Sequence, residues 1–234
     1  PEENGPYNEI IEKYGATAKT SQAPMSAYLT VFNELIRAGY DILCIAMSSR
    51  LSGTYSSALA AARAVSHKRI KVVDSLTTVY GQYLLTEKAV ELIRQGKRLL
   101  EVAQELELMR NKIGLVFSVD NIDALRRGGR LSIVRQSVST ILNVRPILLC
   151  KDGVIVADGN AKGKSALIRE LLARIPKNAV KIGIMNMNTQ DIADELYNRL
   201  KALHPKCLVE HWNLGPVIGI HLGPVAIGLG WIIS

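Results

Sequence analysis

Two runs of buried-strand type, each followed by a helical pattern, constrain the fold of this 234-residue chain more than any other feature. The first run, YDILCIAM, covers residues 40–47, and the second, RIKVVDS, covers residues 69–75. Such runs are typical of parallel strands that are buried on both faces. Helical spacing precedes, separates and follows them, so we expect residues 1–112 to form an α/β domain with a parallel sheet.

The second half of the chain mixes hairpin signals with helical patterns. Strands are predicted over 113–119, 144–158, 179–187 and 207–214, and helices within 121–132, 164–175 and 189–204. The tripeptide Lys151-Asp152-Gly153 interrupts the second of these stretches and indicates a hairpin turn between two strands. We therefore expect residues 113–234 to form a separate α+β domain with a mixed or antiparallel sheet.

The two ends of the chain are less regular. A short helix is predicted over residues 7–14. The tail PVIGIHLGPVAIGLGWII, residues 216–233, nearly reaches membrane-spanning length. Its glycines, Pro224 and His221 argue against a spanning helix, so two short buried strands joined at Gly223-Pro224 are predicted instead.

Composition narrows the classes of function. Hydrophobic residues make up 48% of the chain and aromatic residues only 5%, which favours an aliphatic cleft over an aromatic stacking platform. The net charge of +8 permits anionic ligands, but the aromatic residues are not interleaved with the basic ones as in a single-strand nucleic-acid surface. Cys44, Cys150 and Cys207 are widely spaced and odd in number, which indicates reduced thiols in a cytoplasmic protein. No signal-peptide pattern is visible.

A serine-rich loop follows the first apolar run, in the stretch SSRLSGTYSSALAAAR at residues 48–63. A loop between a strand and a helix presents backbone N–H groups, and the helix dipole adds partial positive charge. Gly53 allows an anion to approach the backbone, and Ser49, Ser52 and Thr54 offer hydroxyl donors. The loop lacks the lysine of a P-loop, so a nucleoside triphosphate is a poor fit. An anion site is predicted, with simple N-capping by Ser52 as the alternative.

Three other features carry two interpretations each. The loop KTSQAP, residues 19–24, is either a second hydroxyl-bearing loop or an ordinary turn. The stretch RRGGR, residues 126–130, is either a solvated helix end or an arginine patch for a phosphate or an acidic partner. His221 is either a hydrogen-bonded core residue or a group that faces the same anion as the serine loop. His67, His204 and His211 show no metal-binding spacing with it, so no metal site is predicted.

Together these segments resemble the DegV family of bacterial fatty-acid-binding proteins. The matching boxes, in family order, are TSQAP, SSRLSGTYSSA, VVDS, DALRRGGRLS, ILNVRPIL followed by DG, and VIGIHLGP. The family also begins with a strand that carries an Asp-Ser-Thr box, and this chain contains no such box. Further departures are Val225, where a glycine is usual, and Ala161 and Gly163, in a stretch that usually carries arginine.

The resemblance implies two unlike domains with a fatty acid bound in the cleft between them and no cofactor. Its acyl chain would lie in an apolar tunnel. Thr20 and Ser52 would hydrogen-bond the carboxylate, with the Gly53 amide and His221 close by and Ser21, Ser49 and Thr54 as neighbouring hydroxyls. Arg130 would lie on the face used by a separate kinase subunit, which phosphorylates the presented carboxylate for phospholipid synthesis. The chain would then be a binding subunit without catalytic residues and without stable membrane insertion.

Two other classes of function remain open from the residues alone. The first is an enzyme, either a small-molecule phosphotransferase or a serine hydrolase that uses Ser52 and His221. The sequence contains no G-x-S-x-G elbow, which counts against the hydrolase. The second is a basic regulatory or nucleic-acid-binding protein, whose binding would depend strongly on salt.

Overall fold

The computed structural model describes residues 17–120, 122–131 and 144–234, which fall into two compact units. Unit 2 comprises Ser21–Ile113 together with the turn Asp152–Val154. Unit 1 comprises Gly114–Lys151, Ile155–Ser234 and the described residues up to Thr20. We describe each unit by itself. The helix predicted over residues 7–14 lies outside the described residues.

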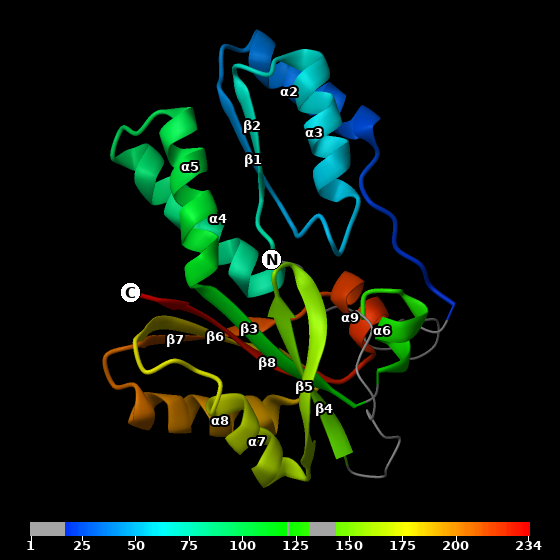
Figure 1. Cartoon of the computed structure of the whole chain (residues 1–234), viewed down its shortest axis with the longest axis vertical. Helices are drawn as coiled ribbons and strands as arrows, with labels where there is room; N and C mark the ends of the chain where they lie inside the picture. The colour runs from blue at the N-terminus through cyan, green and yellow to red at the C-terminus, as the bar shows by residue number, and fades with distance from the viewer. Residues whose placement is uncertain (1–16, 121, 132–143) are drawn as a thin grey trace. The chain divides into compact units, whose positions relative to one another are not determined.

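Unit 2 is a parallel strand pair covered by helices on both faces, as the apolar runs predict. Strands β1 (Ile42–Ala46) and β2 (Ile70–Asp74) pair in parallel. Helices α2 (Met25–Arg37) and α3 (Thr54–Val65) pack on one face, and α4 (Val79–Arg94) and α5 (Leu99–Met109) pack on the other (Figure 1). A 3-10 turn, Arg110–Lys112, ends the unit. Alternate residues of each strand enter different cores, which explains why the first strand reads as a continuous apolar run and the second places Ile70, Val72 and Val73 on both faces.

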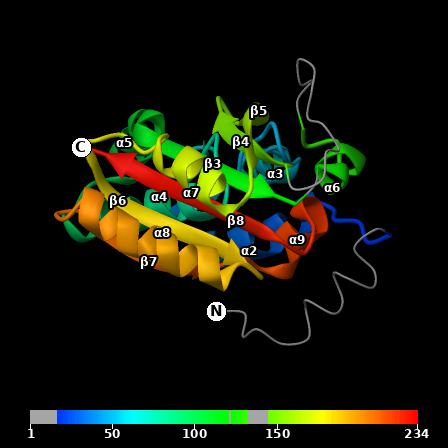
Figure 2. The ribbon, with the colours of Figure 1, turned by 90° about the horizontal axis from the view of Figure 1, so that it is seen from below.

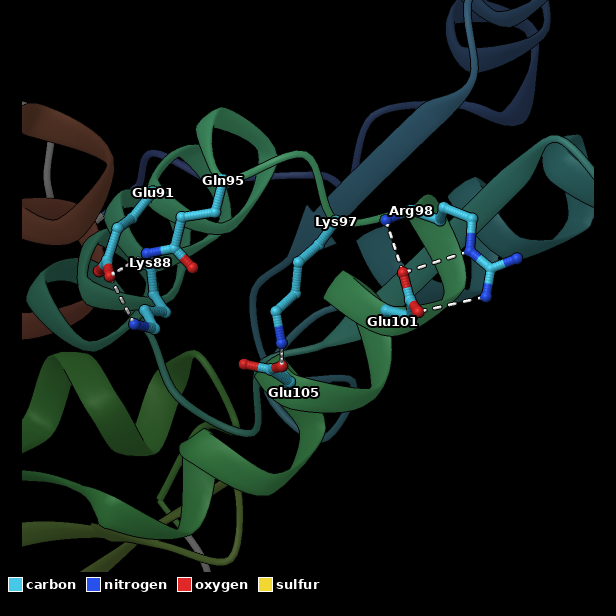
Figure 3. Close-up of polar contacts among 7 residues, drawn as sticks. All are labelled: Lys88, Glu91, Gln95, Lys97, Arg98, Glu101 and Glu105. Carbon is cyan, nitrogen blue, oxygen red and sulfur yellow. Dashed lines mark hydrogen bonds and ion pairs between the residues drawn. The ribbon is translucent and has the colours of Figure 1, made fainter.

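The junction between α4 and α5 is held by charged side chains (Figure 3). Gly96 has a φ of +81°, which lets the chain leave α4 sharply. At the start of α5, the backbone N–H of Arg98 donates to Glu101 Oε2 at 2.8 Å, so Glu101 satisfies an amide that the helix leaves free. Lys97 forms an ion pair with Glu105 one turn further along. These pairs are exposed, so they orient the junction more than they stabilise it.

Unit 1 is built on a six-stranded mixed sheet with the order β5-β4-β3-β8-β6-β7. Its strands are β3 (Ile113–Val119), β4 (Val144–Lys151), β5 (Val154–Lys162), β6 (Ala179–Met187), β7 (Leu208–Asn213) and β8 (Ala226–Ile233). β6 pairs in parallel with β7 and antiparallel with β8. Helices α7 (Lys164–Leu172) and α8 (Gln190–Leu203) pack against one face and enclose the main core (Figure 2). The predicted mixed sheet is therefore confirmed.

The hairpin predicted at Lys151-Asp152-Gly153 is present between β4 and β5. Asp152 and Gly153 both have positive φ, +50° and +81°. Two consecutive positive φ values are the signature of a type I′ turn, which matches the twist of paired strands. Within unit 2, the Gly153 carbonyl accepts a 2.7 Å hydrogen bond from Ser48 Oγ, and the Asp152 carbonyl accepts one of 3.0 Å from Arg50 Nη1. The turn is thus fixed by the residues that begin the serine loop.

The prediction for the C-terminal tail is wrong in its first half. Residues Pro216–Leu222 form a short helix, α9, and only Ala226–Ile233 form a strand. Pro216 occupies the first helical turn, where its missing N–H costs nothing, and Gly223 ends the helix with a φ of +85°. The periodicity of a short apolar, glycine-rich run does not distinguish a strand from a helix, and in α9 only Gly219 is buried while Val217 is exposed. His221 is therefore helical.

The Gly153 position gives a test of the turn. Replacing Gly153 by alanine should lower the free energy of unfolding by about 2–4 kcal/mol, from left-handed strain and overpacking together. The new Cβ would lie 2.5 Å from Ser48 Oγ. Gly39→Ala is the matched control in the same unit, because φ is +91° there and no described atom lies within 4 Å of the new Cβ. It should lose only about 1–2 kcal/mol. Equal losses in urea unfolding would contradict the crowding at Gly153.

Candidate functional site

The serine loop lies at the carboxyl end of β1 in unit 2, and its first serine is structural. Ser48 is fully buried, and its hydroxyl donates to Gly153 O while accepting the Arg50 N–H at 3.2 Å. Ser49 is exposed, and its backbone N–H donates to Asp74 Oδ1 at 3.1 Å. Asp74 also accepts the Leu76 N–H at 3.1 Å, so one carboxylate orders the loops after β1 and β2.

The centre of the loop presents hydroxyls at the start of α3. Ser52 Oγ and Thr54 Oγ1 share a 2.8 Å hydrogen bond, and the Thr54 N–H donates to Ser52 Oγ at 3.2 Å. Gly53, not Ser52, occupies the N-cap position of α3, but the Ser52 hydroxyl accepts the first amide of the helix, so part of the capping alternative is retained. The first turn of α3 contains no acidic residue. Its partial positive charge is therefore not offset locally and suits an anion.

The part of the second hydroxyl-bearing loop that belongs to unit 2 lies near the serine loop. A Cβ built on Gly53 would approach the side chain of Gln22 to 2.8 Å, which places Gln22 beside Gly53 within unit 2. Ser21 is exposed in the same loop. Sequence reasoning did not single out Gln22 or Asp74. Gln22 belongs to the TSQAP motif, and Asp74 lies at the end of a predicted strand, so the motif and the strand end could have identified these two residues.

Unit 1 brings together residues from three distant parts of the chain. Thr20 Oγ1 and His221 Nε2 lie 2.7 Å apart, a hydrogen bond between the first and last motif boxes. A Cβ built on Gly128 would lie 3.0 Å from His221 Nδ1, so the imidazole packs against the turn after α6 (Asp123–Arg127). Arg130 follows this turn and donates from Nη1 to the Gly128 carbonyl. The predicted proximity of Thr20 and His221 is present, while their role in binding stays a prediction.

The electrostatics around His221 favour a neutral imidazole. Burial lowers its pKa below the ordinary value of 6.5, and the nearby positive charge of Arg130 lowers the pKa further. At neutral pH the ring therefore has one N–H donor and one acceptor nitrogen and carries no charge. His221 can orient a hydroxyl or a ligand oxygen, but it is poorly suited to neutralise a negative charge.

Two of the residues that depart from the motif pattern, Ala161 and Gly163, lie in unit 1. Ala161 is buried in the main core of unit 1. Gly163 is the N-cap of α7 with a φ of +80°, and no described atom lies within 4 Å of a Cβ built on it.

Among the described residues, no cluster of histidine, cysteine, aspartate and glutamate is arranged to hold a metal ion. None of the helices described has the length and apolarity needed to cross a bilayer.

Comparison with known proteins decides the family. A family model described as "Uncharacterised protein, DegV family COG1307" matches residues 3–234. The chain belongs to the DegV family. Protein DegV of Bacillus subtilis (strain 168) is 31% identical over 233 residues, which cover 96% of this chain and 82% of that protein.

Solved structures of similar proteins share the fold. The crystal structure of B. subtilis DegV, described as a fatty acid binding protein, is 30% identical with a TM-score of 0.84, and the match covers 97% of this chain and 83% of that one. A DegV family protein of Thermus thermophilus, described by its fatty acid binding, is 28% identical with a TM-score of 0.85, covering 97% and 84%. The Fatty Acid Kinase (Fak) B3 protein of Streptococcus pneumoniae, loaded with linoleic acid, is 22% identical with a TM-score of 0.83, covering 99% and 85%. This last likeness concerns the fold alone.

The neutral state of His221 in this DegV-family protein predicts a pH dependence of stability. Because the pKa of His221 is lowered in the folded state, the unfolded chain binds a proton first as the pH falls. The contribution of His221 is therefore complete above pH 6.5 and is lost as the pH falls through the folded-state pKa. Urea unfolding between pH 8 and pH 5 should show a steeper loss for the wild type than for His221→Gln. Parallel pH profiles for the two proteins would contradict the lowered pKa.

Proposed function

We propose that this protein binds a long-chain fatty acid and holds its carboxylate with Thr20, Ser52, the Gly53 amide and His221. The observation that carries the proposal is the 2.7 Å hydrogen bond between Thr20 Oγ1 and His221 Nε2. This bond joins two motif residues that lie 201 positions apart in the sequence. The descriptions of the B. subtilis and T. thermophilus relatives as fatty acid binding proteins support the same ligand.

The direction of the hydrogen bonds follows from the ligand. A carboxylate only accepts hydrogen bonds, so Thr20 must direct its single hydroxyl hydrogen at the ligand. His221 then donates from Nε2–H to Thr20 Oγ1, which selects the Nε2–H tautomer. The Ser52 and Thr54 pair follows the same logic, because Thr54 can donate to Ser52 Oγ and leave the Ser52 hydrogen for the carboxylate. Each ligand-facing hydroxyl is thus oriented by a second group.

Neutral donors suit a head group that must later react. An ion pair with arginine would hold the carboxylate tightly, whereas hydroxyls, an amide and a helix N-terminus satisfy it without a permanent salt bridge. The acyl chain supplies most of the affinity, at about 0.8 kcal/mol per buried methylene. We propose that the acyl chain lies in an apolar tunnel that begins at the residues that hold the carboxylate. Ser21, Ser49 and Thr54 complete the polar rim around it.

We also propose that a separate kinase subunit acts on the bound fatty acid. The kinase would transfer the γ-phosphoryl group of ATP to a carboxylate oxygen, which gives an acyl phosphate and ADP. The similarity in fold to the S. pneumoniae Fak B3 protein and the motif boxes support this role. Arg130, which lies close enough to His221 to lower its pKa, would contact this partner. No described contact favours a hydrolase, because His221 bonds to Thr20 and Ser52 bonds to Thr54.

The ligand itself can be identified directly. Solvent extraction of the purified protein followed by mass spectrometry should yield a fatty acid in near-stoichiometric amount. The delipidated protein should bind added fatty acid saturably. An empty extract together with a lack of saturable binding would refute the proposal.

Thr20 provides the sharper test. Thr20→Val keeps the shape of the side chain and removes the hydroxyl, so the dissociation constant for the fatty acid should rise about 10- to 100-fold, the effect of losing a hydrogen bond to a charged group. Thr20→Ser retains the hydroxyl and should bind within a few-fold of the wild type. Calorimetric titration of the delipidated proteins measures both. A valine variant that binds as the wild type does would remove Thr20 from the site.

A further inference from the structure

His221 lies on α9, a helix too short to be stable without contacts to the rest of unit 1. His221 lies in the last turn of α9, which has only seven residues. Helices of this length are not stable alone in water, so α9 depends on its packing against α6 and on the contacts at its two ends. The residues that enter and leave α9 are both hydrogen-bonded to one segment, Asn186–Thr189, at the carboxyl end of β6. We call this segment the α9 clamp.

The clamp holds the chain that enters α9 through Asn186. The Asn186 carbonyl accepts the Leu214 N–H at 2.9 Å, and Asn186 Nδ2 donates to Asn213 Oδ1 at 3.2 Å. Asn186 is buried, and its Oδ1 accepts the Thr189 N–H at 3.0 Å. A buried amide with its donors and acceptor satisfied is rigid, because any movement leaves a polar group without a partner.

The clamp holds the chain that leaves α9 through its last two residues. Asn188 Nδ2 donates to the Pro224 carbonyl at 2.9 Å, and Thr189 Oγ1 donates to the Ala226 carbonyl at 3.0 Å. Pro224 follows His221 by three positions in the chain. Asn188 itself has a φ of +54°, a left-handed conformation that asparagine tolerates better than most residues. This conformation is what the sharp exit from β6 requires.

We propose that Asn188 and Thr189 are positioning residues, which hold α9 so that His221 stays in hydrogen-bonding distance of Thr20. On the other side of the ring lies Gly128, where an added Cβ would come within 3.0 Å of Nδ1, so the turn after α6 accommodates the imidazole only because this residue is glycine. The hydrogen bonds of the clamp fix the chain on either side of α9. The inference rests on the proposed function, since the Thr20 hydroxyl orients the fatty-acid carboxylate only when His221 donates to it.

Two variants remove the donor of Asn188 and keep its backbone. Asn188→Gly accepts a positive φ without strain, and Asn188→Asp keeps the size of the side chain but presents an oxygen to the Pro224 carbonyl. Asn188 is exposed, so neither variant opens a cavity. Asn33→Asp is the matched control, because Asn33 Nδ2 donates to the Leu29 carbonyl at 2.8 Å within α2 of unit 2.

The main readout is fatty-acid affinity in two backgrounds. In the delipidated wild type, both Asn188 variants should raise the dissociation constant about 5- to 10-fold, the effect of one neutral hydrogen bond, while Asn33→Asp should leave it unchanged. In a His221→Ala background the Asn188 variants should have no further effect, because a residue that acts through His221 is not additive with its loss. Equal effects of Asn188→Asp with and without His221, or no effect in either, would overturn the proposal.

A second readout separates this inference from the proposed function. NMR titration of the His221 imidazole in ligand-free protein reports its pKa without any fatty acid. In Asn188→Gly, which adds no charge, the half-buried imidazole should become more exposed, so its pKa should rise toward the ordinary value, while Asn33→Asp should not change it. A wild type that fails to bind fatty acid would refute the proposed function and leave this measurement valid. An unchanged pKa in Asn188→Gly would refute the clamp.

Discussion

The hydrogen bond between Thr20 and His221 is the interaction on which the candidate site depends. It requires a glycine at position 128, because a Cβ there would crowd the imidazole. It also requires the number of helical residues before His221 in α9, since one residue more or less between Pro216 and His221 would rotate the ring by about 100°. Gly128 and α9 come from different parts of unit 1, so the contact between Thr20 and His221 depends on the tertiary structure of that unit.

Charge explains why the site is built from neutral groups although the chain carries a net charge of +8. Burial lowers the pKa of His221, and the positive charge of Arg130 lowers it further, so the ring stays uncharged at neutral pH. In the proposed function the polar residues set the orientation of the carboxylate, and the apolar chain supplies the affinity. Such a division leaves the head group accessible to chemistry by a partner.

Much of the fold could be predicted from the sequence, because in those segments the local residue pattern favours the same structure as the tertiary packing. The run at 40–47 is apolar at nearly every position, and the run at 69–75 contains Ile70, Val72 and Val73. Because both are short and alternate with helical patterns, they favour parallel strands covered on both faces. Asp152-Gly153 favours two positive φ values, so the hairpin follows from the turn residues alone. Residues 216–222 were predicted wrongly because the apolar composition was taken to require burial in a strand, whereas these residues form a short helix in which only Gly219 is buried.

The sequence by itself determined which residue types carry the chemistry: hydroxyls before α3, a second hydroxyl box near the start of the described chain, and one histidine near its end. It also determined the parallel pair, the hairpin and the family. Only the tertiary structure decided which of these residues meet, because a contact between positions 20 and 221 leaves no local trace in either segment. The same holds for the α9 clamp, whose asparagines read as ordinary loop residues until the chain folds around them.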